Sequence, residues 1–321
     1  MKFFACMLIT AASLVSTAAL AQAYPAKPVR MIITFPPGGP TDIAARLIAA
    51  KTGEGLGQPV LPDNRAGASG VIAAEVAARA APDGYTMLLS PVSSHLIPYF
   101  IAKNHPFHPV KDFTLICNAT ESSSGVVVNS ALPVTNLREL IELAKRELGK
   151  LTYSSAGVGT LFHLTGELFN QAAGVNMVHI PYKGAAQALT DLSSGQISVT
   201  FSILAPVLSH VRTGKVRLIA ILESARNASM PDVPTVTETL PGFQKLGGGL
   251  GFYGPAGLPR PIVQRLNAEI VKAIFAPEVK AKLEDFGFRV SASTPEEFAT
   301  LMKNEFETYG RAVKLAGLKQ E

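Results

Sequence analysis

The stretch VRMIITFPPGGPTDIAARLIAA, residues 29–50, decides the fold of this chain. Its first seven residues form an apolar run that is typical of a strand covered on both faces of a sheet. Residues 36–40, Pro-Pro-Gly-Gly-Pro, end that strand, and apolar side chains then return at helical spacing as far as Gly53. Threonine is a residue type that caps helix starts, so we expect Thr41 to be the N-cap. The stretch therefore predicts a strand, a stiff loop and a helix.

The same order of elements is repeated immediately downstream. We expect a short strand at 59–62, a loop at 64–70, a helix at 71–80 and another strand at 85–90. Strands that alternate with helices in this way form a parallel sheet with right-handed crossovers. The first part of the chain is therefore predicted to be an α/β unit.

A second unit of the same kind begins near residue 125. Its strands are expected at 125–129, 151–154, 177–181, 197–201 and 216–222, and its helices at 137–148, around His163 to Leu168 and around Leu189 to Leu192. A Pro-rich connector at 231–241 follows, and three closing helices are expected to begin at Pro261, Pro277 and Pro295. Two α/β units predict two lobes. Ligands in such folds bind beyond the carboxyl ends of the strands, so a cleft between the lobes is the expected site.

The first 23 residues are typical of a secretory signal. Lys2 precedes an apolar run that reaches Leu20, and Ala21-Gln22-Ala23 matches the pattern that signal peptidase accepts. A membrane anchor is the competing interpretation, because the run approaches membrane-spanning length. We expect cleavage before Tyr24 and a periplasmic location. Cys117 is then the single cysteine of the mature chain, which excludes an intrachain disulfide and predicts a small buried apolar role.

The composition excludes several classes of function. The 321 residues include 29 Lys and Arg against 24 Asp and Glu, with no basic run and no Trp, so we expect no binding of nucleic acid. The six histidines form no metal-binding set, and the motifs of zinc proteases, dithiol enzymes, serine hydrolases and P-loop enzymes are missing. Residues 249–254, GLGFYG, match a dinucleotide-binding motif, but Pro255 and Pro259 follow where that fold needs a helix. We expect neither a metal nor a cofactor.

Three loops between a strand and a helix combine small residues with hydroxyl groups: 35–42, 66–69 and 155–160. Glycine lets the backbone approach a ligand, and the unpaired N–H groups at a helix start favour an anion. These loops could instead only connect strands to helices, but the occurrence of three favours an anion site. Asp42 would repel an anion, so we expect it to hold the first loop. The five other histidines are not expected to contact the ligand. We expect His95, His179 and His210 to be structural, and the pair His105 and His108 to lie at the surface.

These segments resemble a known family. The motifs that carry the resemblance are FPPGGPTD at 35–42, NRAGASG at 64–70, DGY at 83–85, YSSAGVGT at 153–160 with His163, PYKG at 181–184, PDVPT at 231–235 and GPAGLP at 254–259. In this order they are similar to the substrate-binding proteins of tripartite tricarboxylate transporters, also called the Bordetella uptake gene family. The resemblance covers essentially the whole chain after residue 23.

The resemblance implies an α/β, two-lobed periplasmic-binding-protein fold of type II, the Venus flytrap, in which each lobe is a mostly parallel sheet flanked by helices. We expect the first lobe at 24–122 and 246–321 and the second at 123–245. It also implies a monomeric binding protein, not an enzyme, that captures a small carboxylate (a dicarboxylate, a tricarboxylate or an aromatic acid) and presents it to membrane permease subunits. A sensory module for a membrane kinase and, less favoured, a hydrolase that uses Ser155 or His163 are the alternatives.

The resemblance further implies which residues contact the ligand. The first lobe would supply Pro37, Gly38, Gly39, Thr41, Ala68 and Ser69. The second lobe would supply Ser155, Gly157, Thr160, His163, Tyr182 and Ser202, together with the region around Lys183. Two departures from the family pattern affect the pocket, because Ser202 replaces a common Asp and residues 247–251 lack a common Trp. We expect these departures to alter its size and polarity.

Overall fold

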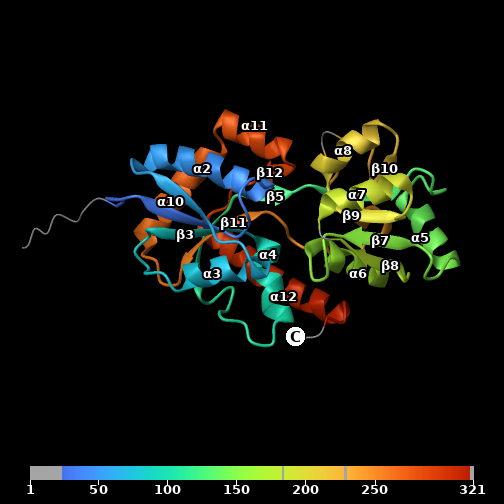
Figure 1. Cartoon of the computed structure of the whole chain (residues 1–321), viewed down its shortest axis with the longest axis horizontal. Helices are drawn as coiled ribbons and strands as arrows, with labels where there is room; N and C mark the ends of the chain where they lie inside the picture. The colour runs from blue at the N-terminus through green and yellow to red at the C-terminus, as the bar shows by residue number, and fades with distance from the viewer. Residues whose placement is uncertain (1–23, 183, 228–229, 319–321) are drawn as a thin grey trace, which may run out of the picture.

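The computed structural model describes residues 24–182, 184–227 and 230–318. The predicted leader at 1–23 and Lys183 lie outside these residues. Two five-stranded sheets, each packed between helices, form two lobes that extended segments connect (Figure 1). Within the described ranges, every helix is too short or too polar to cross a membrane.

The first sheet has the strand order β2-β1-β3-β11-β4. Its strands are β1 (Val29–Ile33), β2 (Val60–Asn64), β3 (Thr86–Pro91), β4 (Phe113–Asn118) and β11 (Leu250–Pro255). β1 pairs in parallel with β2 and β3, and β11 runs antiparallel between β3 and β4. The sequence pattern predicted β1, β2 and β3 but neither β4 nor β11. The glycines of the dinucleotide-like motif lie in β11, where Phe252 and Tyr253 are fully buried, so they form part of a central strand and not a nucleotide loop.

Helices cover both faces of this sheet. They are α2 (Pro40–Leu56), the 3-10 turn η1 (Ala68–Gly70), α3 (Val71–Ala78), α4 (Val92–Ile101), α10 (Arg260–Ile274), α11 (Pro277–Asp285) and α12 (Pro295–Leu315). One apolar cluster packs α2 and α10 against the sheet, and another packs α3, α4 and α12. The last three helices have their prolines in the first turn, as predicted: α11 and α12 begin at Pro277 and Pro295, and α10 begins one residue before Pro261. The prediction that Thr41 is an N-cap was wrong: Gly39 is the N-cap, because Pro40 takes the first helical position, where its fixed φ and missing N–H fit.

The second sheet has the order β8-β7-β9-β6-β10. Its strands are β6 (Ser124–Asn129), β7 (Thr152–Ser155), β8 (Val178–Pro181), β9 (Val199–Ile203) and β10 (Val216–Ile221). All five were predicted, with ends that differ by at most two residues. Its helices are α5 (Leu137–Arg146), α6 (Leu161–Ala173), α7 (Ala185–Ser194), α8 (Leu204–Arg212) and α9 (Val236–Thr239). The sequence pattern did not predict α8, and α9 lies inside the stretch expected to be only a connector.

The strand register places the carboxyl ends of the parallel strands of both sheets at the junction between the lobes. β11 enters the first sheet from the second lobe at Leu250, which pairs with Pro91 at the end of β3. β6 enters the second sheet from the first lobe at Ser124, which pairs with Ile203 at the end of β9. A strand that arrives from the other lobe starts at the edge nearest that lobe. The ends of β1, β2 and β3 therefore face the junction from one side, and those of β7, β8 and β9 from the other.

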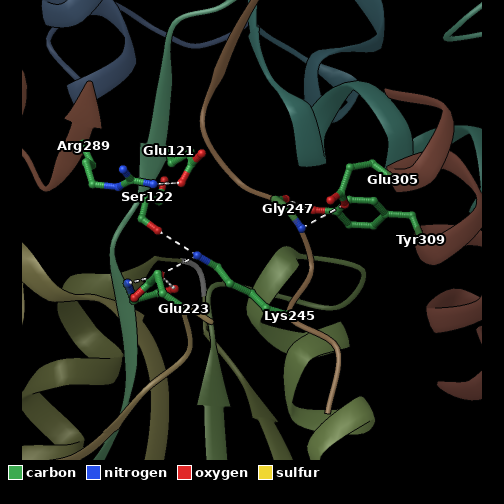
Figure 2. Close-up of polar contacts among 9 residues, drawn as sticks. Glu121, Ser122, Glu223, Lys245, Gly247, Arg289, Glu305 and Tyr309 are labelled. Carbon is green, nitrogen blue, oxygen red and sulfur yellow. Dashed lines mark hydrogen bonds and ion pairs between the residues drawn. The ribbon is translucent and has the colours of Figure 1, made fainter. Parts of the chain in front are cut away.

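The first crossing between the lobes runs through β5 (Thr120–Ser122), which pairs antiparallel with β12 (Phe288–Val290). Arg289 and Glu121 form an ion pair across this ribbon (Figure 2). Both side chains are largely exposed, so the ion pair contributes little to stability. The backbone ladder between β5 and β12 is therefore what fixes this crossing to the first lobe.

Side chains from both lobes hold the second crossing. Lys245 forms an ion pair with Glu223, just past the end of β10, and also donates to a carbonyl of β5 at 3.0 Å. Two residues further on, the N–H of Gly247 donates to Glu305 of α12 at 2.9 Å, and its carbonyl accepts from Tyr309 of the same helix (Figure 2). The two crossings are thus tied to each other and to the closing helix.

The start of α6 packs against the first lobe. Leu164 is fully buried in the same apolar cluster as Phe298 and Met302 of α12. A Cβ atom added at Gly159, just before α6, would lie 3.2 Å from Ile101 at the end of α4. The loop at 155–160 therefore lies directly at the interlobe junction.

Candidate functional site

A carboxylate holds the first loop from inside. The N–H of Gly38 donates to Asp42 Oδ2 at 2.9 Å. Asn64 Nδ2 donates to Asp42 Oδ1 at 2.8 Å and to the carbonyl of Phe35 at 2.9 Å, and Arg46 Nε donates to Asp42 Oδ2 at 2.9 Å. Asp42 therefore ties the loop to the end of β2 and to the first turns of α2, which is the structural role predicted for it.

The charge of Asp42 is compensated locally. Burial by itself raises the pKa of Asp42, but hydrogen bonds from Arg46, Gly38 and Asn64 outweigh burial and hold the pKa below its ordinary value. The carboxylate is therefore ionised at neutral pH, next to the guanidinium of Arg46. A ligand anion at this loop would meet a neutralised pair and not a bare negative charge.

The four residues predicted to bind ligand in this loop have different environments. Pro37 and Gly38 are exposed, Gly39 is half-buried and Thr41 is buried. The N–H of Gly38 is already bonded to Asp42, so that group is not a free donor. The helix start at Gly39 lacks a side-chain cap, so the first amides of α2 have no such partner.

The second loop holds four consecutive residues at positive φ: Gly67 at 133°, Ala68 at 44°, Ser69 at 53° and Gly70 at 99°. A left-handed backbone costs a residue with a Cβ about 1–2 kcal/mol, and such strain persists where the surrounding structure imposes it. A Cβ added at Gly70 would lie 3.2 Å from Thr34, at the end of β1. The loop therefore sits beside the first one, and exposes the predicted ligand residues Ala68 and Ser69 at the junction edge.

Hydroxyl groups shape the third loop. Ser155 Oγ donates to the carbonyl of Gly157 at 2.9 Å and accepts the N–H of the same residue at 3.1 Å. Thr160 Oγ1 donates to that carbonyl at 2.7 Å. Thr160 is the N-cap residue of α6, yet its side chain does not cap the helix. The hydroxyls predicted to contact the ligand are thus used inside the loop, and the first-turn amides of α6 lack a side-chain partner.

Two histidines lie against this loop, and the sequence pattern indicated only one of them. His163 Nδ1 accepts the N–H of Gly159 at 3.1 Å, and its ring stacks on that of His179 with centroids 4.0 Å apart. His179 Nε2 lies 2.7 Å from Ser155 Oγ. Burial lowers the pKa of both rings, that of His179 to about 4, so both are neutral at pH 7. The one signal for His179 in the sequence is that it is a polar residue within the otherwise apolar strand expected at 177–181.

Two other predicted ligand residues make contacts within the second lobe. The Tyr182 hydroxyl donates to Asp191 of α7 at 2.7 Å, and burial and this carboxylate raise the pKa of Tyr182 to about 12. Ser202 Oγ donates to the carbonyl of Ile203 at 3.1 Å and is half-buried at the end of β9. Ser202 thus lies at the junction edge of the sheet, whereas the polar end of Tyr182 turns to α7.

Helix starts at these loops present backbone donors. α2, α3 and α6 follow the three loops, and the structure gives none of these three a side-chain cap. Side chains cap α5, α9 and α12 (Asn136, Thr235 and Thr294), whereas α4, α7, α8, α10 and α11 also lack such a cap, so α2, α3 and α6 are distinguished by their place at the three loops. Uncapped N–H groups and the positive end of the helix dipole favour an anion. Such helix starts come from both lobes and open toward the same junction.

The contact between Ser155 and His179 resembles a nucleophile with its base. However, the Ser155 hydroxyl donates to Gly157, and among the residues that the structure describes no carboxylate is hydrogen-bonded to the second ring nitrogen of His179. The same residues contain no group of three His, Cys, Asp or Glu side chains arranged for a metal ion. The hydrogen bonds of Ser155 and His179 therefore give no support for covalent chemistry.

A family model described as tripartite tricarboxylate transporter family receptor matches residues 44–318. The chain belongs to this family. The matched range includes the second and third loops of the receptor, while its first loop immediately precedes the match.

Relatives of this receptor match it over nearly their full length. Protein BugT of Bordetella pertussis is 33% identical over 302 residues, which are 93% of this chain and 92% of BugT. MatC from Rhodopseudomonas palustris, solved with bound malate, has a TM-score of 0.74 at 32% identity, with 90% of this chain and 100% of MatC covered. An R. palustris protein solved with adipate has a TM-score of 0.78 at 29% identity, with 93% and 100% covered. These structures confirm the two-lobed binding-protein fold.

Proposed function

We propose that this receptor captures a small aliphatic dicarboxylate between its lobes and presents it to the membrane permease subunits of a tripartite tricarboxylate transporter. The observation that carries the proposal is that helix starts without side-chain caps come from both lobes, α2 and α3 on one side and α6 on the other. Each end of a dicarboxylate would meet one set of backbone donors. The relatives solved with malate and adipate support an acid of this size.

In this proposal the first lobe binds one carboxylate through the backbone around Gly39, Ala68 and Ser69, beside Pro37. Gly38 and Thr41 act by fixing the loop and the helix start. The second lobe binds the other carboxylate at the first turn of α6, after Thr160. His163 contributes a neutral donor there, because its Nδ1 accepts from Gly159 and its proton is therefore on Nε2.

The remaining predicted residues shape the pocket. Ser155 and Gly157 set the course of the third loop, and Ser202 and the backbone of Tyr182 border it. We place the lobe boundaries at 122/123 and 245/246, within the two crossings, so that the lobes close by rotation about them. We also propose that the leader is removed before Tyr24 and that the mature monomer acts in the periplasm.

The hydrogen-bond energies expected at the two carboxylates are sufficient for micromolar affinity. A hydrogen bond to a charged group contributes about 1.5–3 kcal/mol, and micromolar binding needs about 8 kcal/mol. A few such bonds at each carboxylate therefore suffice, once the cost of closing the lobes is met. Closure is favoured only to the extent that the ligand binds the closed form more tightly.

The test compares an acid with its neutral ester. Thermal unfolding and titration calorimetry are carried out with adipate, malate and dimethyl adipate, which matches adipate in its carbon chain but carries no charge. We expect at least one diacid to raise the melting temperature and bind at about micromolar Kd, whereas the diester does neither. Binding of the diester as tight as that of adipate, or no binding of any diacid, would contradict the proposal. Consumption of the diester would favour the hydrolase alternative instead.

A further inference from the structure

A stack of three rings lies beneath the third loop. The ring of His179 on β8 stacks on that of His163 with centroids 4.0 Å apart, and on that of Tyr153 with centroids 5.0 Å apart. Tyr153 is fully buried, and its hydroxyl donates to Glu167 at 2.6 Å, while the carbonyl of His163 lies 3.2 Å from the same oxygen. The stack therefore joins β7, β8 and α6, the three elements that border the loop at 155–160.

The hydrogen bonds of Ser155 favour one tautomer of His179. A serine hydroxyl has one hydrogen, and we assign that of Ser155 to the carbonyl of Gly157 at 2.9 Å, because a carbonyl can only accept. With this assignment, His179 Nε2 carries the proton and donates the bond of 2.7 Å to Ser155 Oγ. Ser155 Oγ thus accepts from His179 and from the N–H of Gly157, which lies at 3.1 Å.

The position of Gly157 depends on this arrangement. Its φ of 132° belongs to a region that glycine reaches without strain, as one of many conformations open to it, so hydrogen bonds are what hold the peptide in this one. Its carbonyl accepts from Ser155 and Thr160, and its N–H donates to Ser155. A Ser155 side chain that is free to change rotamer would release the N–H of Gly157 and leave its carbonyl bonded to Thr160 alone.

We propose that His179 is a positioning residue for ligand binding: its Nε2–H holds the Ser155 hydroxyl in the rotamer that orients the Gly157 peptide and the start of α6. The role rests on the proposed function of the loop. His179 acts through Ser155 and makes no contact with the ligand itself. Of the charged and titratable side chains in the described residues around it, His163 and Tyr153 face its ring, and Glu167 lies behind Tyr153.

The first arm of the test needs no ligand. Amide hydrogen exchange at Gly157 is measured by NMR in the wild type, in His179→Leu and in His179→Gln, whose side-chain amide can replace the Nε2–H donor. We expect His179→Leu to speed exchange about three- to tenfold, as the loss of one hydrogen bond allows, and His179→Gln to restore it. Unchanged exchange in His179→Leu overturns the proposal. If His179→Leu does not fold, His179→Asn replaces it, because its shorter amide falls short of Ser155 while keeping a polar group.

The second arm measures the Kd of adipate and malate by calorimetry. We expect His179→Leu to weaken binding about three- to tenfold, with His179→Gln near the wild type. His210→Leu is the matched control, since His210 bonds to Ser193 at 3.0 Å in the same lobe but away from the loop, and it should leave Kd unchanged. In a Ser155→Ala background the His179→Leu substitution should add no further loss, and an additive loss would overturn the proposal. If the wild type binds neither diacid, the proposed function fails, and Gly157 exchange alone decides the role of His179.

Discussion

Asp42 shows how a carboxylate can shape an anion site without occupying it. Its two oxygens accept from the Gly38 backbone, from Asn64 and from Arg46. A negative charge in the first turn of α2 is also favoured by the helix dipole. The positive end of the α2 dipole, which would also attract a ligand anion, therefore stabilises the Asp42 carboxylate. This carboxylate faces the inside of the loop.

We predict that Asp42→Asn lowers the free energy of unfolding by about 1–3 kcal/mol, because an amide cannot accept all of these hydrogen bonds. Urea unfolding at pH 7 measures the loss. Asp285→Asn, which removes a carboxylate from an exposed pair at 3.6 Å, is the matched control and should stay within about 0.5 kcal/mol of the wild type. Equal effects of the two substitutions would show that Asp42 does not hold the loop.

The lowered pKa of Asp42 also determines how the stability of the protein changes at acid pH. The pKa of Asp42 in the folded chain lies below its ordinary value, so its contribution is present above that value and is lost as the pH falls through the folded pKa. As the pH falls below about 4, the ordinary pKa of an Asp side chain, Asp42→Asn should therefore lose less stability than the wild type, which urea unfolding at a series of pH values measures.

At the same scale, the sequence indicated which loops lie at the junction between the lobes, but not which of their polar atoms lack a partner within the protein. Gly-rich, hydroxyl-bearing loops after strands are a property of residue type, and all three loops lie at the junction. Whether Ser155 and Thr160 point outward depends on rotamers and on a partner carbonyl at Gly157. His179 was missed because its bond to Ser155 crosses between two strands, and residue spacing along one strand carries no sign of it.

At the scale of elements, local signals decided what could be predicted. Most strands and helices with an apolar run or a proline start were found, including the last three helices, but β4, α4 and α8 were missed. β11 was missed because its glycines and prolines resemble a turn, although its residues are buried between two neighbours. Its strand character comes from those neighbours, which are far away in the sequence.

The closing helix carries a capping box that can be tested directly. Thr294 accepts the N–H of Glu297 at 3.2 Å, while Glu297 accepts the N–H of Thr294 at 2.9 Å. We predict that Thr294→Ala lowers the free energy of unfolding by about 1 kcal/mol, because the N–H of Glu297 loses its side-chain acceptor. Thr300→Ala, on the exposed face of the same helix, is the control. Chemical denaturation of both variants decides, and a loss no greater than that of the control would contradict the capping role.

At the scale of the whole molecule, the two segments that cross between the lobes pack too closely to leave room for a side chain at Gly249. A Cβ added at Gly249, where φ is 132°, would lie 1.9 Å from the carbonyl oxygen of Thr120 in the first crossing. The two crossings therefore touch through backbone, and the missing side chain at this position is what lets them do so. Glu305 and Tyr309 of α12 hold Gly247, which lies close by on the same crossing.

We predict that Gly249→Ala destabilises the protein by more than about 3 kcal/mol, since backbone strain and a clash with another backbone add up. Gly257→Ala is the matched control, because its φ is 83° but nothing lies within 4 Å of the added atom, so it should cost only about 1–2 kcal/mol of strain. Thermal unfolding of the two variants separates the effects. Equal melting temperatures would mean that the crossings can move apart at no cost.

The place of β11 has a consequence for how the nascent chain folds. β11 lies between β3 and β4, which do not pair with each other. It is synthesised only after all the strands of the second sheet. Until residue 255 has been synthesised, the first lobe consists of two separate pieces of sheet, whereas the inserted lobe already possesses all five of its strands. The inserted lobe can therefore complete its fold before the first lobe does. Its folding would then place β11 close to its position between β3 and β4.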